Sequence, residues 1–132
     1  MKSILLVEDH MIFAQALLRM LQGKGHYEVK AVATSADEAL EKLPGLEVDL
    51  VLVDVSLPGR SGISLVILLH EKYPHLPCIM LSGHLSTHYA RNSLAAGARG
   101  YLIKDQTGEI LDGIQHVLNG EIYVSKAVRE QS

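Results

Sequence analysis

Short apolar runs alternate along the chain with longer segments whose apolar residues recur at helical spacing. Three of these runs are apolar at every position, which is typical of strands buried on both faces of a parallel sheet covered by helices. The five runs that predict strands span residues 4–7, 29–33, 50–53, 78–81 and 101–103.

The segments between these runs predict five helices. Ser35 and Glu38 have the spacing of a capping box, and Ser86 or Thr87 can cap the fourth helix. The helices are expected within residues 12–22, from 35 to the Pro44-Gly45 pair, within 63–73, from 86 to 97 and within 110–118. Five strand–helix units predict one α/β domain with a doubly wound parallel sheet.

The last segment of the chain, from Tyr123 onward, shows no partner strand in this pattern. We therefore expect residues 1–123 to form the domain. Residues 124–132 are expected to be a tail, or the start of a linker to an absent effector domain.

Polar side chains follow four of the predicted strands where each strand ends. Glu8 and Asp9 follow the first, Asp54 the third, Ser82 the fourth and Lys104 the fifth. Ligands of open α/β sheets bind at this edge. Crowded carboxylates need a cation, and Mg²⁺ prefers such oxygen ligands while leaving room for a phosphoryl group. A carboxylate that accepts the phosphoryl group becomes an acyl phosphate.

Composition narrows the class of protein further. The chain has 132 residues, of which 48% are hydrophobic and 20% charged, as in an ordinary single globular domain. A net charge of −3 has the wrong sign for a domain that binds DNA by itself. The single Cys78 excludes an internal disulfide and a cysteine-based zinc site, and the seven histidines are expected to lie on the surface or at the rim of the site. No apolar stretch near the N-terminus suits a signal peptide or a membrane span, so we expect a cytoplasmic protein without membrane contact.

Four motifs containing these polar residues resemble the receiver domain of bacterial two-component response regulators. They lie at residues 5–10 (LLVEDH), 49–59 (DLVLVDVSLPG), 81–83 (LSG) and 97–105 (GARGYLIKD). Within this family the sequence resembles the NarL/FixJ-type subgroup at two positions, where His10 follows Asp9 and Asp105 follows Lys104. The resemblance implies a flavodoxin-like (CheY-like) sheet of five parallel strands in the order 2-1-3-4-5, with five helices.

The same resemblance implies roles for the acidic residues and the lysine. Asp54 would be the phosphoacceptor. Glu8, Asp9, Asp54 and the backbone carbonyl of Ser56 would hold Mg²⁺, and Lys104 would neutralise the phosphoryl oxygens.

Four further positions are implied to switch or tune the site. The Ser82 hydroxyl would move towards the phosphoryl group, and Tyr101 would turn inward to fill the space it leaves. Ser56 and His84 flank the acceptor and would tune the lifetime of the acyl phosphate.

The implied function is a signalling switch that accepts a phosphoryl group from a histidine kinase. It is not an enzyme beyond catalysing its own phosphorylation and dephosphorylation. It could dimerise on activation, and would contact DNA only through an absent effector domain in transcription regulation. Two alternatives remain open, namely a stand-alone receiver acting by protein contact and an unphosphorylated interaction module.

Two other classes are disfavoured by particular residues. Phosphatases of the haloacid-dehalogenase type carry two aspartates two residues apart after the first strand, whereas here Asp54 follows the third strand and Ser56 stands two residues onward. A flavodoxin-like electron carrier needs a hydroxyl-rich phosphate loop, and the Glu8-Asp9 pair would repel a flavin phosphate.

The third predicted helix has more apolar residues than one buried face requires. Ile67 and Leu68 are expected to point outward and to form a protein contact. Ala14 and Leu18 on the first helix are expected to do the same.

Overall fold

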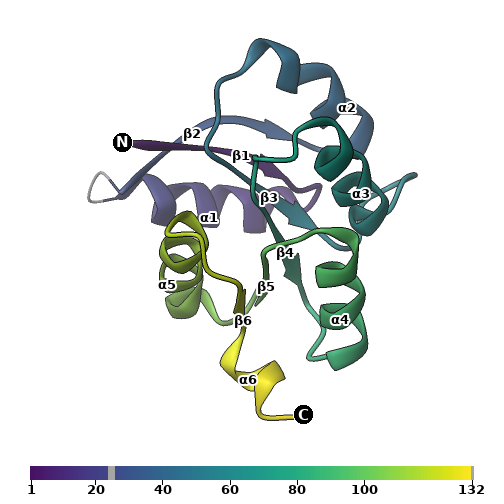
Figure 1. The fold of residues 1–132 in the computed structure, drawn as a ribbon. Coiled ribbons are helices and arrows are strands. Elements are labelled where there is room, and N and C mark those ends of the chain that lie inside the picture. The colour runs from purple at the N-terminus through teal and green to yellow at the C-terminus, as the bar shows by residue number, and fades with distance from the viewer. Residues whose placement is uncertain (24–25, 132) are drawn as a thin grey trace.

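The computed structural model describes residues 1–23 and 26–131, and shows a parallel sheet between two layers of helices (Figure 1). The sheet has six strands in the order β2-β1-β3-β4-β5-β6, and every neighbouring pair is parallel. The strands are β1 (Lys2–Val7), β2 (Tyr27–Ala33), β3 (Leu50–Asp54), β4 (Cys78–Ser82), β5 (Gly100–Ile103) and β6 (Tyr123–Val124).

The helices cover the two faces of the sheet unequally. Helices α1 and α5 pack on one face, and α2, α3 and α4 pack on the other (Figure 1). The elements are α1 (Met11–Gln22), α2 (Ala36–Lys42), a 3₁₀ turn (Leu43–Gly45), α3 (Gly62–Lys72), α4 (Thr87–Ala96), α5 (Thr107–Leu118) and α6 (Lys126–Arg129).

The continuous apolar runs of the central strands supply both cores. In β1, Ile4 and Leu6 face the core beneath α1 and α5, while Leu5 and Val7 face the other core. All four side chains are fully buried. A strand covered on both faces cannot alternate apolar with polar residues, which is why the predicted runs are apolar throughout.

The expectation of five strands and five helices is wrong, because the chain after residue 122 adds β6 and α6. The Tyr123 N–H donates to the Arg99 carbonyl at 3.0 Å, and the Ser125 N–H donates to the Tyr101 carbonyl at 2.8 Å. These bonds extend the sheet beside β5. A strand of two residues has no hydrophobic period, so the sequence pattern gave no sign of it.

Serine caps begin two helices as predicted. The Ser35 hydroxyl accepts from the Glu38 N–H at 3.1 Å, and the Ser86 hydroxyl accepts from the Tyr89 N–H at 3.1 Å. The Glu38 carboxylate accepts from the N–H of Thr34, one residue before the cap. The Pro44-Gly45 pair ends α2 through the 3₁₀ turn.

The outward positions on α1 and α3 agree only in part with the predicted ones. Ile67 is 42% exposed, whereas Leu68 and Leu18 are half-buried. Ala14 is buried, so its expected outward position is wrong. The face of α1 that packs on the sheet runs through Ala14 and Leu17, since these two lie three residues apart. None of the helices within the described residues is long and apolar enough to cross a membrane.

Candidate functional site

The carboxyl ends of β1, β3 and β5 bring three acidic side chains and one lysine together. Lys104 Nζ lies 2.8 Å from Glu8 Oε1 and 3.0 Å from Asp54 Oδ2. Asp9 follows Glu8 directly and contributes to the same acidic cluster. In a parallel sheet, neighbouring strands end at one edge, and this explains how residues up to 96 positions apart in the sequence can meet.

The backbone around Asp54 holds its carboxylate in place. Asp54 is the last residue of β3 and is 2% exposed, and its Oδ1 accepts from the Ser56 N–H at 3.0 Å. Helix α3 starts against this strand end, where the Gly62 N–H donates to the Val55 carbonyl. A Cβ at position 62 would lie 2.1 Å from the Asp54 carbonyl oxygen, so the approach requires glycine.

The two buried carboxylates have pKa values that shift in opposite directions. Burial and a shared hydrogen bond with Glu8 raise the pKa of Asp54, and the bonds from Ser56 and Lys104 offset this only in part. Burial also opposes ionisation of Glu8, but hydrogen bonds with Asp54, Lys104 and His10 outweigh it and lower its pKa. Two adjacent carboxylates therefore share one lysine, and the site favours an additional positive charge.

The acidic cluster fits a hard divalent cation. Glu8, Asp9, His10 and Asp54 each offer one ligand atom, and these atoms lie within 4.8 Å of one another. Asp9 Oδ1 is shielded from solvent and has no hydrogen-bond partner among the residues described. A buried acceptor without a donor is costly, and a cation would satisfy it. Ser56 stands two residues after Asp54, in the loop between β3 and α3.

His10 is the site residue that the sequence reasoning missed. It was expected at the surface or the rim, and its side chain is indeed mostly exposed, but its Nδ1 lies 3.0 Å from Glu8 Oε2 and 3.4 Å from Asp54 Oδ2. The side-chain hydrogen bond with Glu8 is the main cause of a raised His10 pKa. The sequence feature that could have identified His10 as part of the site is its position directly after Glu8 and Asp9, at the end of a strand.

Ser82 and Tyr101 lie on the neighbouring strands and both contact the backbone of His84. The buried Ser82 hydroxyl accepts from the His84 N–H at 3.0 Å. Tyr101 is fully buried, and its hydroxyl donates to the His84 carbonyl at 2.9 Å. The hydroxyl of Ser82 thus bonds the β4–α4 loop in this structure, and the Tyr101 ring already points inward.

An open hollow of about 680 Å³ lies over Asp54. Phe13, Ile12 and His84 line it together with Lys104. Ile12 is 88% exposed, and Lys104 Nζ lies 4.9 Å from the centre of the Phe13 ring. The Asp54 carboxylate is therefore buried, and it lies at the floor of a hollow that is open to solvent.

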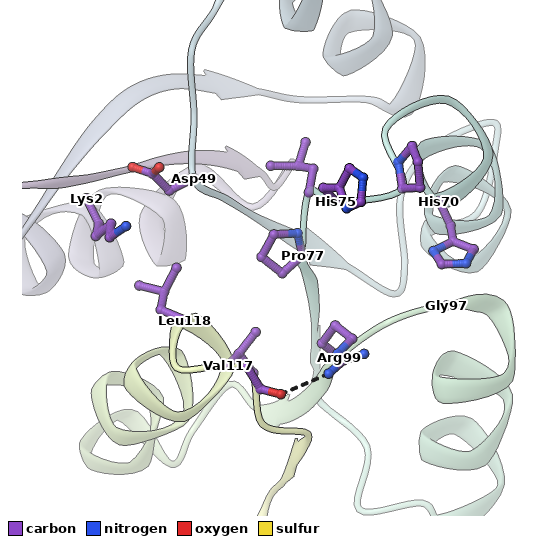
Figure 2. Close-up of a pocket in the computed structure, with 12 residues that line it drawn as sticks. Lys2, Asp49, His70, His75, Pro77, Gly97, Arg99, Val117 and Leu118 are labelled. Atoms are coloured by element: carbon purple, nitrogen blue, oxygen red, sulfur yellow. Dashed lines mark hydrogen bonds between the residues drawn. The ribbon is translucent and has the colours of Figure 1, made fainter.

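A second hollow, of about 440 Å³, lies at the opposite end of the sheet (Figure 2). Lys2, Asp49 and Arg99 line it, near the amino ends of β1, β3 and β5. Asp49 accepts hydrogen bonds from the N–H and hydroxyl of Ser3, and the Arg99 guanidinium donates to the Gly120 carbonyl at 3.0 Å. Asp49 and Arg99 therefore have partners within the fold, and this hollow lies away from the acidic cluster.

The fold and the acidic edge of the sheet define a CheY-like α/β domain. The family model for the response regulator receiver domain matches residues 4–115. The chain therefore belongs to the response regulator receiver domain family, whose members are signalling proteins. Its relatives are response regulators of the NarL/LuxR/FixJ type, as the sequence resemblance predicted.

Particular relatives agree with this assignment. The chain is 34% identical over 126 residues to the transcriptional regulatory protein MctR of Rhizobium johnstonii, covering 95% of this chain and 59% of that protein. A LuxR-family response regulator from an Aurantimonas species superposes with a TM-score of 0.92 at 27% identity, covering 97% and 92% of the two chains. A CheY-like receiver domain from Methanospirillum hungatei has a TM-score of 0.81 at 31% identity, covering 91% and 95%. The chain spans between half and three-fifths of the length of the first curated relatives it matches.

Proposed function

We propose that this domain is a phosphorylation-activated switch in which Asp54 accepts a phosphoryl group from a histidine kinase. The observation that carries the proposal is the buried Asp54 carboxylate, 3.0 Å from Lys104 Nζ and grouped with Glu8 and Asp9 beneath an open hollow. Receiver domains interact with histidine kinases, and the reaction is expected in the cytoplasm.

In the proposed transfer, one carboxylate oxygen of Asp54 attacks the phosphorus of a kinase phosphohistidine. A P–O bond forms while the P–N bond breaks, and the histidine nitrogen leaves with the electron pair of that bond. The Ser56 N–H orients the other oxygen, because it already binds Asp54 Oδ1. Hydrolysis of the acyl phosphate releases inorganic phosphate and restores the carboxylate. Ser56 and His84 line the hollow over Asp54 and would tune the rate of this hydrolysis.

Positive charge around Asp54 would neutralise the phosphoryl oxygens during the transfer. Glu8, Asp9, Asp54 and the carbonyl of Ser56 would hold Mg²⁺, which supplies positive charge for the phosphoryl oxygens when it is bound. Lys104 provides a second positive charge that reaches both Glu8 and Asp54. Such positioning and neutralisation, rather than proton transfer, lowers the barrier to phosphoryl transfer.

The bonds of Ser82 and Tyr101 to the backbone of His84 support the proposed switch. A phosphoryl group on Asp54 adds strong acceptors, and the Ser82 hydroxyl would leave the His84 N–H to donate to them. The β4–α4 loop would then move relative to Tyr101, whose hydroxyl binds the same loop at His84. We further propose that this change controls transcription through an output region, because the chain covers 59% of the length of the transcriptional regulatory protein MctR. We also propose that the activated domain forms a homodimer.

A labelling experiment tests the proposal. The protein is incubated with radiolabelled phosphoramidate in the presence and absence of Mg²⁺, alongside the variants Asp54→Asn and Asp105→Asn. The wild type and Asp105→Asn should take up label only with Mg²⁺, whereas Asp54→Asn should take up none. Equal labelling of Asp54→Asn would show that the acceptor lies elsewhere, and labelling of no protein would favour the interaction module.

A further inference from the structure

Glu109, in the first turn of α5, makes three hydrogen bonds to the end of the chain. Its Oε2 accepts from the Tyr123 hydroxyl at 2.6 Å and from the Lys126 N–H at 2.8 Å. Its Oε1 accepts from the Ser125 hydroxyl at 2.7 Å. These donors come from residues 14 to 17 positions later in the chain. Bonds to an ionised carboxylate are the stronger hydrogen bonds of proteins.

The hydrogen bonds of Glu109 differ from those that a glutamate at this position of a helix usually makes. A glutamate three residues after the N-cap commonly bonds back to the cap. Here the N-cap is Gln106, whose side chain makes no cap bond, and the Glu109 carboxylate instead points to the C-terminal segment, which we define as residues 122–131. Burial raises the pKa of Glu109, but the bonds from Tyr123, Lys126 and Ser125 outweigh it and lower the pKa. The carboxylate is therefore held in its ionised form.

Tyr123 is fixed by α5 and by the C-terminal segment itself. The His116 ring stacks on it, with centroids 5.1 Å apart and planes inclined by 22°. The Arg129 guanidinium lies 5.5 Å from its ring centre, and Arg129 Nε donates to the Val124 carbonyl at 2.8 Å. A Cβ at Gly113 would lie 3.1 Å from Tyr123 Cδ1, so the ring packs directly on the helix backbone.

The C-terminal segment is also bonded to the strand that carries Tyr101. The Ser125 N–H donates to the Tyr101 carbonyl at 2.8 Å, and Ser125 is fully buried. Val128 is buried in the same apolar core as Tyr101 and Ala90. A two-residue edge strand contributes little stability of its own, so its position depends on these side-chain contacts.

We propose that Glu109 is the positioning residue that anchors the C-terminal segment to α5 and β5, so that the chain leaving the domain moves with these two elements. Lys104 stands five residues before Glu109, and the Lys104 N–H donates to the Ser82 carbonyl at 2.8 Å. A movement of Ser82, Tyr101 and Lys104 on phosphorylation thus reaches the C-terminal segment through β5 and the start of α5. The transmission rests on the proposed function, whereas the anchor does not.

Hydrogen exchange measured by mass spectrometry tests the anchor without any phosphodonor. Glu109→Gln should speed exchange in the C-terminal segment by about tenfold or more, because it removes charge-assisted hydrogen bonds. Tyr123→Phe, which removes one of the three donors, should have a smaller effect in the same segment. Asp112→Asn is the matched control, since Asp112 is exposed on the same helix, and it should leave exchange unchanged. Wild-type protection of the segment in Glu109→Gln would overturn the anchor.

Beryllofluoride with Mg²⁺, a mimic of the acyl phosphate, tests the transmission. In the wild type it should change exchange both in peptides around Asp54 and Ser82 and in the C-terminal segment. In Glu109→Gln the first change should persist and the second should be lost. A response around Asp54 without one in the wild-type segment would overturn the transmission and leave the proposed function standing. No response around Asp54 would overturn the proposed function and the transmission together, while the comparison without ligand would still decide the anchor.

Discussion

Replacing Lys104 with methionine removes the only positive side chain within 3.0 Å of both buried carboxylates in the described part of the chain. At separations of 2.8 and 3.0 Å, each ion pair has a Coulomb attraction of roughly 6 kcal/mol at an effective dielectric constant of 20. The cost of burying the lysine charge cancels much of this attraction, and breaking a buried pair typically costs about 3–5 kcal/mol. Lys104 is 16% exposed on its side chain, and Asp54 can take up a proton, so we expect a loss near the lower end, about 3 kcal/mol.

Urea unfolding followed by far-ultraviolet circular dichroism, at neutral pH in buffer with a chelator, measures this loss. Lys30→Met is the control, because Lys30 is exposed on the edge strand β2, and it should change the free energy of unfolding by less than about 0.5 kcal/mol. Added Mg²⁺ should restore part of the stability of Lys104→Met, since a bound cation replaces the lost charge. A loss no larger than that of Lys30→Met would refute the electrostatic reasoning about this site.

Three further changes have expected outcomes in the same unfolding assay. Asp54→Asn should raise stability in metal-free buffer by an amount on the order of 1 kcal/mol, because the raised pKa shows that the fold disfavours the ionised side chain; a loss of stability would contradict this. Gly62→Ala should cost about 2 kcal/mol or more, because its Cβ would lie 2.1 Å from the Asp54 carbonyl oxygen, whereas Gly108→Ala, with nothing within 4 Å, should be neutral or stabilising; equal effects would argue against the close approach. Folding lowers the pKa of Glu109, so its ionised carboxylate contributes stability above the ordinary pKa of 4.5, and this contribution is lost as the pH falls through the folded-state pKa. The stability difference between wild type and Glu109→Gln should therefore shrink in acid. A difference that grows in acid would contradict the lowered pKa.

The positions of the first five strands could be predicted because each strand contains a short apolar run, whereas their order in the sheet was expected from the resemblance to receiver domains. Residues 50–53 and 78–81 have no polar interruption, and all of them are buried in the structure. The approach of Asp54 to Lys104 could be predicted for a related reason, since residues at the carboxyl ends of parallel strands share one edge. The strand positions and the shared edge could both be predicted because each depends on apolar runs of several consecutive residues.

The features that escaped prediction depend on single contacts between distant residues. Tyr123 of β6 donates its hydroxyl to the Glu109 carboxylate and its N–H to the Arg99 carbonyl, and neither bond can be recognised from the sequence near Tyr123. Ala14 was expected to point outward with Leu18, four residues further on, but it is buried, because a small side chain gives little information about which side of a helix packs on the sheet. The contact of His10 Nδ1 with Glu8 depends on the backbone after β1, where the His10 N–H also donates to the Glu8 carboxylate.

Chemical trapping of the modified residue tests the central claim most directly. Protein treated with phosphoramidate and Mg²⁺ is reduced with borohydride, which converts an aspartyl phosphate to homoserine, and its peptides are sequenced by mass spectrometry. Homoserine should replace Asp54 alone, and only in samples that contained both reagents. Homoserine at Asp9 or at another carboxylate, with Asp54 intact, would contradict the assignment of Asp54 as the acceptor.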